Sequence, residues 1–253
     1  MKNSDPLTVV DKIIKVHGGA DRWISLEAIE ANISVWGLLF TIKQRQLLKR
    51  VRVRASTREP RFSFLDFPQP EQRAELIGVD EVRITDSKGK VLARREQPRL
   101  AFKGLRRLLY WDDLDFTYFG GYATWNYMVT PFLFHRAGFT FETADPLPGM
   151  PSSWTCLQVN FPNDIPAHCR KQVYYFDEHL LLRRHDYTAE VVGGWAHAAH
   201  LCKGYRDFEG LKVPTSRRVL PLFLGNKLLP GPTLVAIEIH DIQPIYVQAE
   251  STL

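Results

Sequence analysis

The chain has 253 residues, of which 45% are hydrophobic and 24% are charged, and its formal net charge is +5. This composition is typical of a globular protein, and a large all-β unit commonly reaches this length as one domain. No segment approaches the roughly 18 consecutive apolar residues that a membrane-spanning helix needs, and three cysteines are too sparse and odd a set for a secreted disulfide framework.

The first ten residues, MKNSDPLTVV, contain no apolar run of signal-peptide length and no small-residue cleavage site. With the sparse cysteines, this predicts a reduced, soluble protein in the cytoplasm. The basic balance is typical of proteins that bind nucleic acid, an anionic membrane surface or an acidic ligand. Arg50, Arg52 and Arg54 alternate with Val51 and Val53, however, which indicates a half-buried strand with arginine on its outer face. A groove for nucleic acid would need aromatic residues between the cations, so we expect no nucleic-acid partner and no stable membrane insertion.

The first element that the sequence predicts is a helix. Asp5-Pro6 supplies a cap and a proline at the first helical position, and Gly18-Gly19 ends the helix. Its apolar face recurs at helical spacing and contains Leu7, Val10, Ile13, Ile14 and His17.

After Trp23 the pattern changes to the alternation of β-strands, with short turn-like links. Before residue 104 we expect strands at 27–36, 38–46, 47–57, 61–67, 72–78, 81–86 and 90–96. After residue 136 we expect strands at 139–145, 154–161, 171–177, 180–191, 198–208, 211–222 and 233–246. A long antiparallel meander of this kind predicts a mainly β (α+β) fold, with one curled sheet or barrel in a single domain over residues 1–253.

Residues 104–136 interrupt the strands and are rich in aromatic side chains. We expect two helical pieces here, broken at Gly120-Gly121, with Pro131 ending or kinking the second. Tyr118, Tyr122, Trp125, Val129 and Phe132 fall on one helical stripe. We expect this insertion to form a lid over a ligand, with the ligand-binding candidates Trp111, Tyr118, Tyr122, Trp125, Asn126, Tyr127 and Phe132. Asn126 has a second interpretation, as a cap of a lid helix.

Three stretches resemble a known family. They are VVDKIIKVHGGADRWISLEAIEANISVWG near the start, YYFDEHLLLRRHDYTAEV, and FEGLKVPTSRRVLP. Together they resemble the lipoprotein-carrier (LolA/LolB-like) fold. The resemblance implies an incomplete antiparallel β-barrel wrapped round an N-terminal helix, with further helices plugging its mouth and a cavity for an apolar molecule. The lipoprotein carriers are exported. Because no signal sequence is recognised here, we expect a cytosolic bacterial branch of this fold and do not carry over the transport role.

The segment LLRRHDYTAEV at 181–191 carries most of the candidate catalytic residues. On a strand, His185 and Tyr187 share the more apolar face, whereas Asp186 points to the opposite side, so His185 and Asp186 cannot form the oriented pair of a catalytic triad. Folding the hairpin about Gly193-Gly194 would place His200 near Ala189 and Cys202 near Tyr187. The inward face then collects His185, Tyr187, His200 and Cys202, and a one-residue slip would turn every side chain over.

These observations leave three functions open. The first is binding of an apolar or aromatic small molecule, such as a lipid or polyketide-like ligand, in the barrel cavity; Cys202 joins the binding candidates. The second is a cofactor-independent cyclase, isomerase or lyase in the same cavity, with His185 or His200 as base and Tyr187 as acid or orienting group. The third is a peripheral membrane or protein-interaction module that uses the arginine-rich outer face. We expect no metal and no cofactor, since no ligand spacing or phosphate loop stands in a suitable context.

Overall fold

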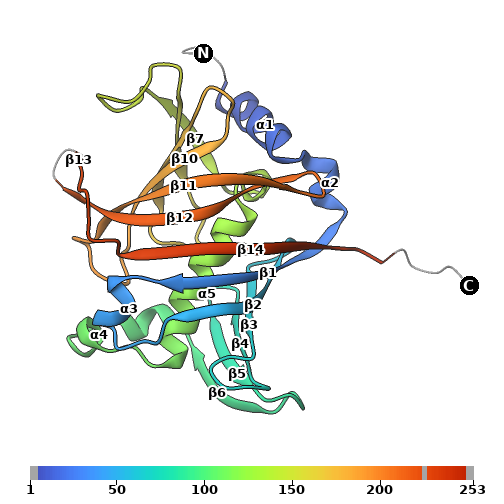
Figure 1. The fold of residues 1–253 in the computed structure, drawn as a ribbon, viewed down its shortest axis with the longest axis vertical. Coiled ribbons are helices and arrows are strands. Elements are labelled where there is room, and N and C mark those ends of the chain that lie inside the picture. Colours follow the sequence, from blue (N-terminus) through green and yellow to red (C-terminus); the bar gives the residue numbers. More distant parts are fainter. Residues whose placement is uncertain (1–4, 224–226, 249–253) are drawn as a thin grey trace, which may run out of the picture.

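The computed structural model describes residues 5–223 and 227–248. In this part of the chain 14 antiparallel strands form one sheet, in the order β6-β5-β4-β3-β2-β1-β14-β12-β11-β10-β9-β8-β7, with β13 paired to β12 beside that path. Figure 1 shows the sheet curving round the helix α5. The edge strands β6 and β7 do not pair with each other, so the structure is an incomplete β-barrel with added helices, as the sequence predicted.

The strands of this sheet follow the chain from residue 26 to residue 246. Their bounds are β1 (Leu26–Trp36), β2 (Leu48–Ser56), β3 (Arg61–Leu65), β4 (Arg73–Ile77), β5 (Glu81–Thr85), β6 (Val91–Glu96), β7 (Thr140–Ala144), β8 (Thr155–Asn160), β9 (Lys171–Phe176), β10 (Leu182–Thr188), β11 (His197–Phe208), β12 (Leu211–Phe223), β13 (Lys227–Leu228) and β14 (Val235–Tyr246).

The helices lie at the start of the chain, after β1, and between β6 and β7. Their bounds are α1 (Pro6–His17), α2 (Ala20–Ile24), α3 (Leu38–Ile42), η1 (Pro98–Phe102), α4 (Arg106–Leu109), α5 (Asp113–Val129) and η2 (Phe132–His135).

The first helix, α1, begins and ends where the sequence predicted. The Asp5 carboxylate accepts a hydrogen bond from the Thr8 backbone N–H, Pro6 opens the helix, and Gly18 follows it with a φ of 138°. The predicted apolar face needs one correction, because Leu7 is exposed and Val9 is buried in its place. α1 contacts β12 and β7 and covers one part of the inner sheet face.

The expected strand over 38–46 is wrong, because residues 38–42 form the short helix α3. Gly37 turns the chain with a φ of 139°, and a Cβ there would lie only 2.3 Å from the carbonyl oxygen of Leu234. The backbone N–H groups of Leu38 and Leu39 then donate to the carbonyls of Thr233 and Leu234. Five consecutive residues without a clear period fit a helix and a strand equally well.

The aromatic segment is also different from the expectation, because α5 runs through Gly120-Gly121 as one helix. A Cβ on Gly120 would lie 3.1 Å from the Phe64 ring, and one on Gly121 would lie 3.0 Å from the Leu76 Cβ. The two glycines therefore allow close packing on β3 and β4. α5 contacts β2 through β6 and is buried almost along its whole length. It is part of the core of the barrel and not a lid.

The N-terminus of α5 is held by charged side chains from two other segments. Asp112 and Asp115 form a capping box, and Arg95 of β6 donates to both carboxylates at 2.6–3.1 Å. Arg45, which follows α3, pairs with Asp113. The end of the helix is as predicted: α5 stops at Val129, just before Pro131.

Candidate functional site

A chain of hydrogen bonds between buried aromatic side chains lies where α5 meets the strands β9 to β12. His168, in the loop before β9, contacts the Tyr122 hydroxyl through Nδ1 at 3.1 Å and the Tyr127 hydroxyl through Nε2 at 2.7 Å. The Tyr127 hydroxyl also lies 2.9 Å from the Tyr187 hydroxyl. The His168 and Tyr187 rings are stacked at 3.9 Å. Two residues of α5 are thereby joined to a loop and to β10.

A second group extends this cluster along β9 and β10. His185 Nε2 lies 2.6 Å from the Gln172 side-chain oxygen, and its ring stacks on Tyr174 at 4.0 Å. Gln172 in turn donates to the Cys169 carbonyl. On the other side of the sheet, Asp186 accepts two hydrogen bonds from Arg184 at 2.6 and 2.7 Å. His185 and Asp186 therefore face opposite sides, as the strand periodicity predicted.

The hairpin register differs from the one expected from the sequence. His185 stands opposite His200, and Tyr187 stands opposite Ala198. The predicted pairing was therefore wrong by an even number of residues. An even shift keeps every side chain on its face, so His185, Tyr187, His200 and Cys202 are all buried on the inner side, as expected. The turn is longer than assumed, because β10 ends at Thr188 and β11 begins at His197.

His200 and its neighbours on β12 form the innermost part of the cluster. His200 is 0% exposed, and neither of its ring nitrogens has a hydrogen-bond partner among the described residues. Its ring lies edge-on to Tyr127, with 4.2 Å between the ring centroids. Arg217 donates to the Tyr127 carbonyl at 2.7 Å and to the Cys202 sulfur at 3.5 Å.

Burial sets the protonation of these groups. Loss of hydration lowers the pKa of His168 to about 3 and lowers the pKa values of His185 and His200 well below the usual range. The same loss raises the pKa values of Tyr127 and Tyr187. At neutral pH the histidines and tyrosines are uncharged. A general base works best with a pKa near the operating pH, so this environment suits a hydrogen-bonding site better than proton transfer.

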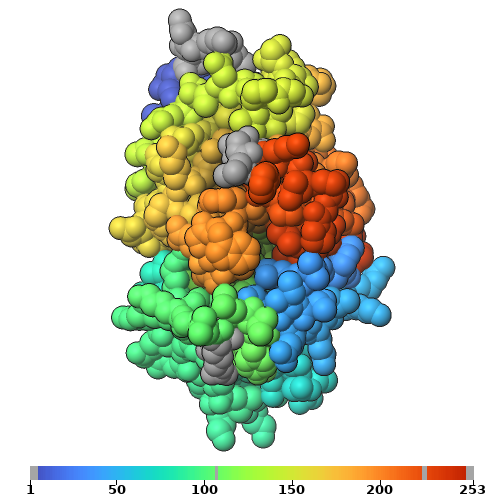
Figure 2. All heavy atoms as spheres, turned by 90° about the vertical axis from the view of Figure 1, so that its left-hand side faces the viewer, coloured from blue at the N-terminus to red at the C-terminus, as the bar shows by residue number. Residues whose placement is uncertain are grey.

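A narrow apolar cleft lies beside this cluster. It lies between α5 and the strands β1 and β14, and Phe40 of α3 is part of its wall. Its lining is Val35, Phe40, Phe64, Phe116, Phe119, Gly120, Ala123, Thr124, Tyr127, Tyr187, Val235 and Ile237, and it encloses about 20 Å³. Figure 2 shows a hollow on this face, between the blue, orange and red segments of the chain. Tyr127 and Tyr187 belong both to the cleft and to the hydrogen-bonded cluster.

The other aromatic residues singled out from the sequence do not line the cleft. Trp111 packs between Phe102 and Phe119, and Phe132 stacks on Trp23 at 4.2 Å. The Trp125 indole donates to the Ser56 carbonyl at 2.9 Å.

Three polar residues from that prediction also lie outside the cleft lining. Tyr118 lies against Arg99, and Tyr122 contacts His168. Asn126 donates to the Tyr122 and Pro166 carbonyls, both at 2.8 Å, so it ties α5 to the loop before β9 and does not cap the helix.

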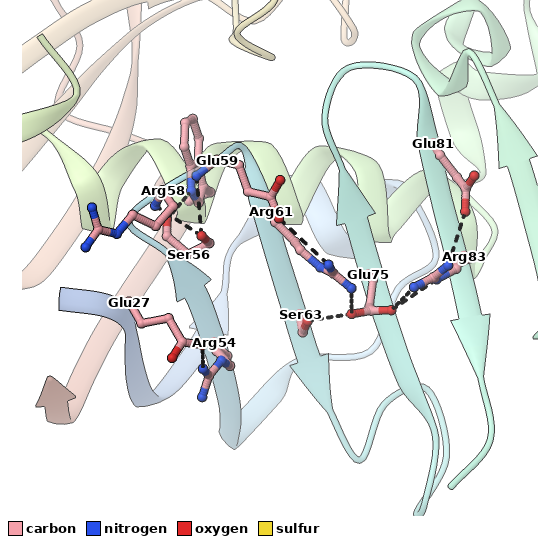
Figure 3. Close-up of polar contacts among 11 residues, drawn as sticks. Glu27, Arg54, Ser56, Arg58, Glu59, Arg61, Ser63, Glu75, Glu81 and Arg83 are labelled. Carbon is pink, nitrogen blue, oxygen red and sulfur yellow. Dashed lines mark hydrogen bonds and ion pairs between the residues drawn. The ribbon is translucent and has the colours of Figure 1, made fainter. Parts of the chain in front are cut away.

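The outer face of β1 to β5 carries the arginines that suggested a surface module. Figure 3 shows part of this face: Arg54 bonds to Glu27, and the buried Glu75 accepts hydrogen bonds from Arg83, Arg61 and Ser63. Arg54 also bonds to Glu30. The Arg54 and Arg61 charges are thus compensated by neighbouring strands. This arrangement is that of an outer sheet face stabilised by ion pairs across strands.

Three residues of the cluster were missed by reasoning from sequence. Arg217 and Gln172 alternate in phase with buried apolar residues on β12 and β9, so strand periodicity carried a signal for both. His168 lies in an irregular loop, where no period indicates which side chain points inward. Only the packing of that loop against α5 reveals it.

Comparisons with known proteins concern the fold. No protein-family model and no curated protein matches the chain. Among solved structures, the chain is similar to a LolA superfamily protein from Nitrosomonas europaea, with a TM-score of 0.53 and 8% identity over 97% of this chain and 96% of that one. It is also similar to a DUF1329 family protein from Desulfovibrio piger, with a TM-score of 0.48 and 12% identity over 99% and 95% of the two chains. The first likeness confirms a LolA-like fold. In the described residues no helix is both long enough and apolar enough to cross a bilayer.

Proposed function

We propose that this protein binds an elongated apolar small molecule, such as a lipid-like chain, in the cleft between α5 and the strands β1 and β14. The observation that carries the proposal is the make-up of the cleft: its walls are aliphatic and phenylalanine side chains, and its inner end bears the hydroxyls of Tyr127 and Tyr187. Sites for small molecules combine apolar walls with a few placed polar groups. A LolA-like sheet curved round a helix gives such a site its frame.

The cleft admits a ligand by opening at α3. Its present volume of about 20 Å³ holds about one water molecule. α3 is a five-residue helix whose Leu38 and Ile42 side chains are exposed, and its buried Phe40 side chain lines the cleft. An outward movement of α3 withdraws Phe40 and exposes the apolar walls. The bound chain then takes the place of the phenylalanine ring.

Binding is better supported than catalysis by the same residues. Of the three catalytic candidates only Tyr187 lines the cleft, and burial lowers the pKa values of His185 and His200. The proposal keeps one domain and a location in the cytosol. The three cysteines are free and buried, which agrees with a reducing compartment.

The test is to look for a bound molecule and then to block its site. Native mass spectrometry of protein purified from its own host, followed by solvent extraction, should reveal a retained apolar compound. Calorimetric titration with decan-1-ol should give binding that Ala123→Leu abolishes, because Ala123 lines the cleft. Ala93→Leu is the matched control: it adds the same atoms on the edge strand β6, outside the cleft.

Two results would overturn the proposal. One is an empty protein that also fails to bind decan-1-ol. The other is equal binding by wild type and a folded Ala123→Leu variant. If Ala123→Leu does not fold, Thr124→Leu repeats the test from the next residue of the cleft wall.

A further inference from the structure

The inner end of the cleft lies beside a buried cation that has no carboxylate partner in the described residues. Arg217 is 3% exposed. Its guanidinium donates to one backbone carbonyl and one thiol, it lies 5.5 Å from the centre of the Tyr127 ring, and its Nε has no partner. Transfer of an arginine out of water costs several kcal/mol unless a counter-charge and full hydrogen bonding offset it.

Arg217 is unusual, because the other buried arginine on the nearby strands has the counter-charge that burial requires. Arg184 is also buried, and it makes a bidentate pair with Asp186 at 2.6 and 2.7 Å. The hydrogen-bond partners of Arg217 among the described residues, and the adjacent His200, are neutral, because burial raises the pKa of the Cys202 thiol and lowers that of His200. The described part of the protein therefore keeps a positive charge at this place without supplying the negative one.

His200 adds a second unused polar group at the same place. It stands opposite Val219 on β12, two residues from Arg217 along the same face, and both of its ring nitrogens lack partners. A buried polar group without a partner is costly and rare in folded proteins. A guanidinium and an imidazole beside each other are the groups that bind a carboxylate or phosphate.

Both residues are next to the cleft. Arg217 stands opposite Ile237 of β14, and Ile237 lines the cleft. Tyr127 also lines the cleft, and its ring contacts both His200 and Arg217. A ligand head group that displaces this ring, which His168 and Tyr187 hold through its hydroxyl, would reach the buried cation from the apolar space.

We propose that the ligand of this cleft is an anionic amphiphile, whose carboxylate or phosphate binds Arg217 and His200 while its apolar chain lies along α5. This proposal rests on the proposed function and names the class of its ligand. The head group supplies the missing counter-charge to Arg217 and accepts a hydrogen bond from His200. The apolar chain of the ligand lies against the walls formed by Val35, Phe116 and Val235.

The experiment compares three ligands with the same chain and different head groups. Decanoate, decyl phosphate and decan-1-ol are titrated by calorimetry into the wild-type protein and into Arg217→Met. We expect at least one of the two acids to bind about thirtyfold more tightly than the alcohol. We expect Arg217→Met to remove this preference, so that the acids bind no more tightly than the alcohol. Whether decanoate or decyl phosphate binds more tightly distinguishes the two head groups.

The neighbouring arginine is the matched control. Arg218 points to the other side of β12, where it pairs with Glu238 at 2.6 Å. Arg218→Met removes the same charge from the same strand and should keep the preference for acids. Arg217→Met should be at least as stable as wild type without ligand, since a buried unpaired charge is replaced by an apolar side chain of similar length.

The outcomes separate this inference from the proposed function. Equal wild-type affinities for both acids and the alcohol would overturn the anionic ligand and leave the apolar cleft intact. Loss of the preference in Arg218→Met as well as in Arg217→Met would also overturn it. No binding of any of the three would overturn the proposed function itself. The comparison of the acids with the alcohol in the wild-type protein needs no variant. It can therefore overturn the anionic ligand even if Arg217→Met does not fold.

Discussion

The hydroxyl groups of Tyr127 and Tyr187 lie 2.9 Å apart and join α5 to β10. Tyr127 has a second partner in His168 Nε2, whereas Tyr187 has no other hydrogen-bond partner in the described part of the chain. A phenol donates one hydrogen bond and accepts others. Tyr187 therefore keeps hydrogen-bonding capacity at the inner end of the cleft, and this pair is where the apolar walls meet the buried polar cluster.

Replacing Tyr187 with Phe should weaken ligand binding. The change removes one buried hydrogen bond and should lower the free energy of unfolding by about 1 kcal/mol in urea denaturation. Tyr122→Phe is the matched control, because it also removes one hydrogen bond to the cluster but lies outside the cleft lining. We expect similar losses of stability, with weaker binding of decanoate in Tyr187→Phe only. Equal affinities in the two variants would contradict a contact between Tyr187 and the ligand.

Strand periodicity predicted most of this fold, because side chains that alternate between water and core leave a clear period of two in the sequence. β10 illustrates both the strength and the limit of that signal. Its inner face was predicted correctly, but its register with β11 was not, since the register depends on the length of the turn between Thr188 and His197. The pairing of His185 with His200 therefore depends on a turn whose length the sequence pattern did not give.

The interior of the barrel was harder to predict for a physical reason. An element buried on all sides has no polar face, so the sequence of α5 carries no contrast that separates a lid from a core helix. Gly120-Gly121 is typical of a break when a helix is considered in isolation. In the folded protein these glycines allow α5 to pack closely on Leu76 instead of breaking the helix. The sequence alone does not show that contact.

Stability should fall steeply in acid because of the buried histidines. Burial holds the pKa of His168 at about 3 in the folded protein, against about 6.5 in the unfolded chain. Between these two values the unfolded chain binds more protons, so the free energy of unfolding decreases as the pH falls. One such histidine contributes a slope of about 1.4 kcal/mol per pH unit. His168→Gln should flatten the slope by that amount between about pH 5.5 and pH 4, measured by urea denaturation. Tyr122→Phe should lower stability without changing the slope, and a parallel curve for His168→Gln would refute the prediction.

Adding one methyl group at Gly121 should destabilise the barrel more than adding it at Gly120. Alanine improves helix propensity by about 1 kcal/mol at either position. The new Cβ at Gly121 would lie 3.0 Å from the Cβ of Leu76, which moves only with its strand, whereas the one at Gly120 meets the tip of the Phe64 ring. Crowding of this kind costs about 1–3 kcal/mol. Thermal unfolding should therefore rank Gly121→Ala below Gly120→Ala, and the reverse order would show that β4 adapts more easily than the ring.

The stability that the ion pairs at the N-terminus of α5 provide should depend on Arg95 and not on its neighbour Arg94. Arg95 donates to Asp112 and to the fully buried Asp115, while Arg94 is 52% exposed and pairs with Glu81 and Glu96 at the edge of the sheet. Removing one partner of a buried pair costs about 3 kcal/mol, and an exposed pair contributes about 0.5 kcal/mol. We expect Arg95→Gln to unfold at clearly lower urea concentration and Arg94→Gln to match wild type within error.

The anchored N-terminus of α5 keeps Phe116 in the cleft wall, so Arg95→Gln should also weaken decanoate binding. Equal effects of the two substitutions on stability would mean that the capping box alone holds the helix.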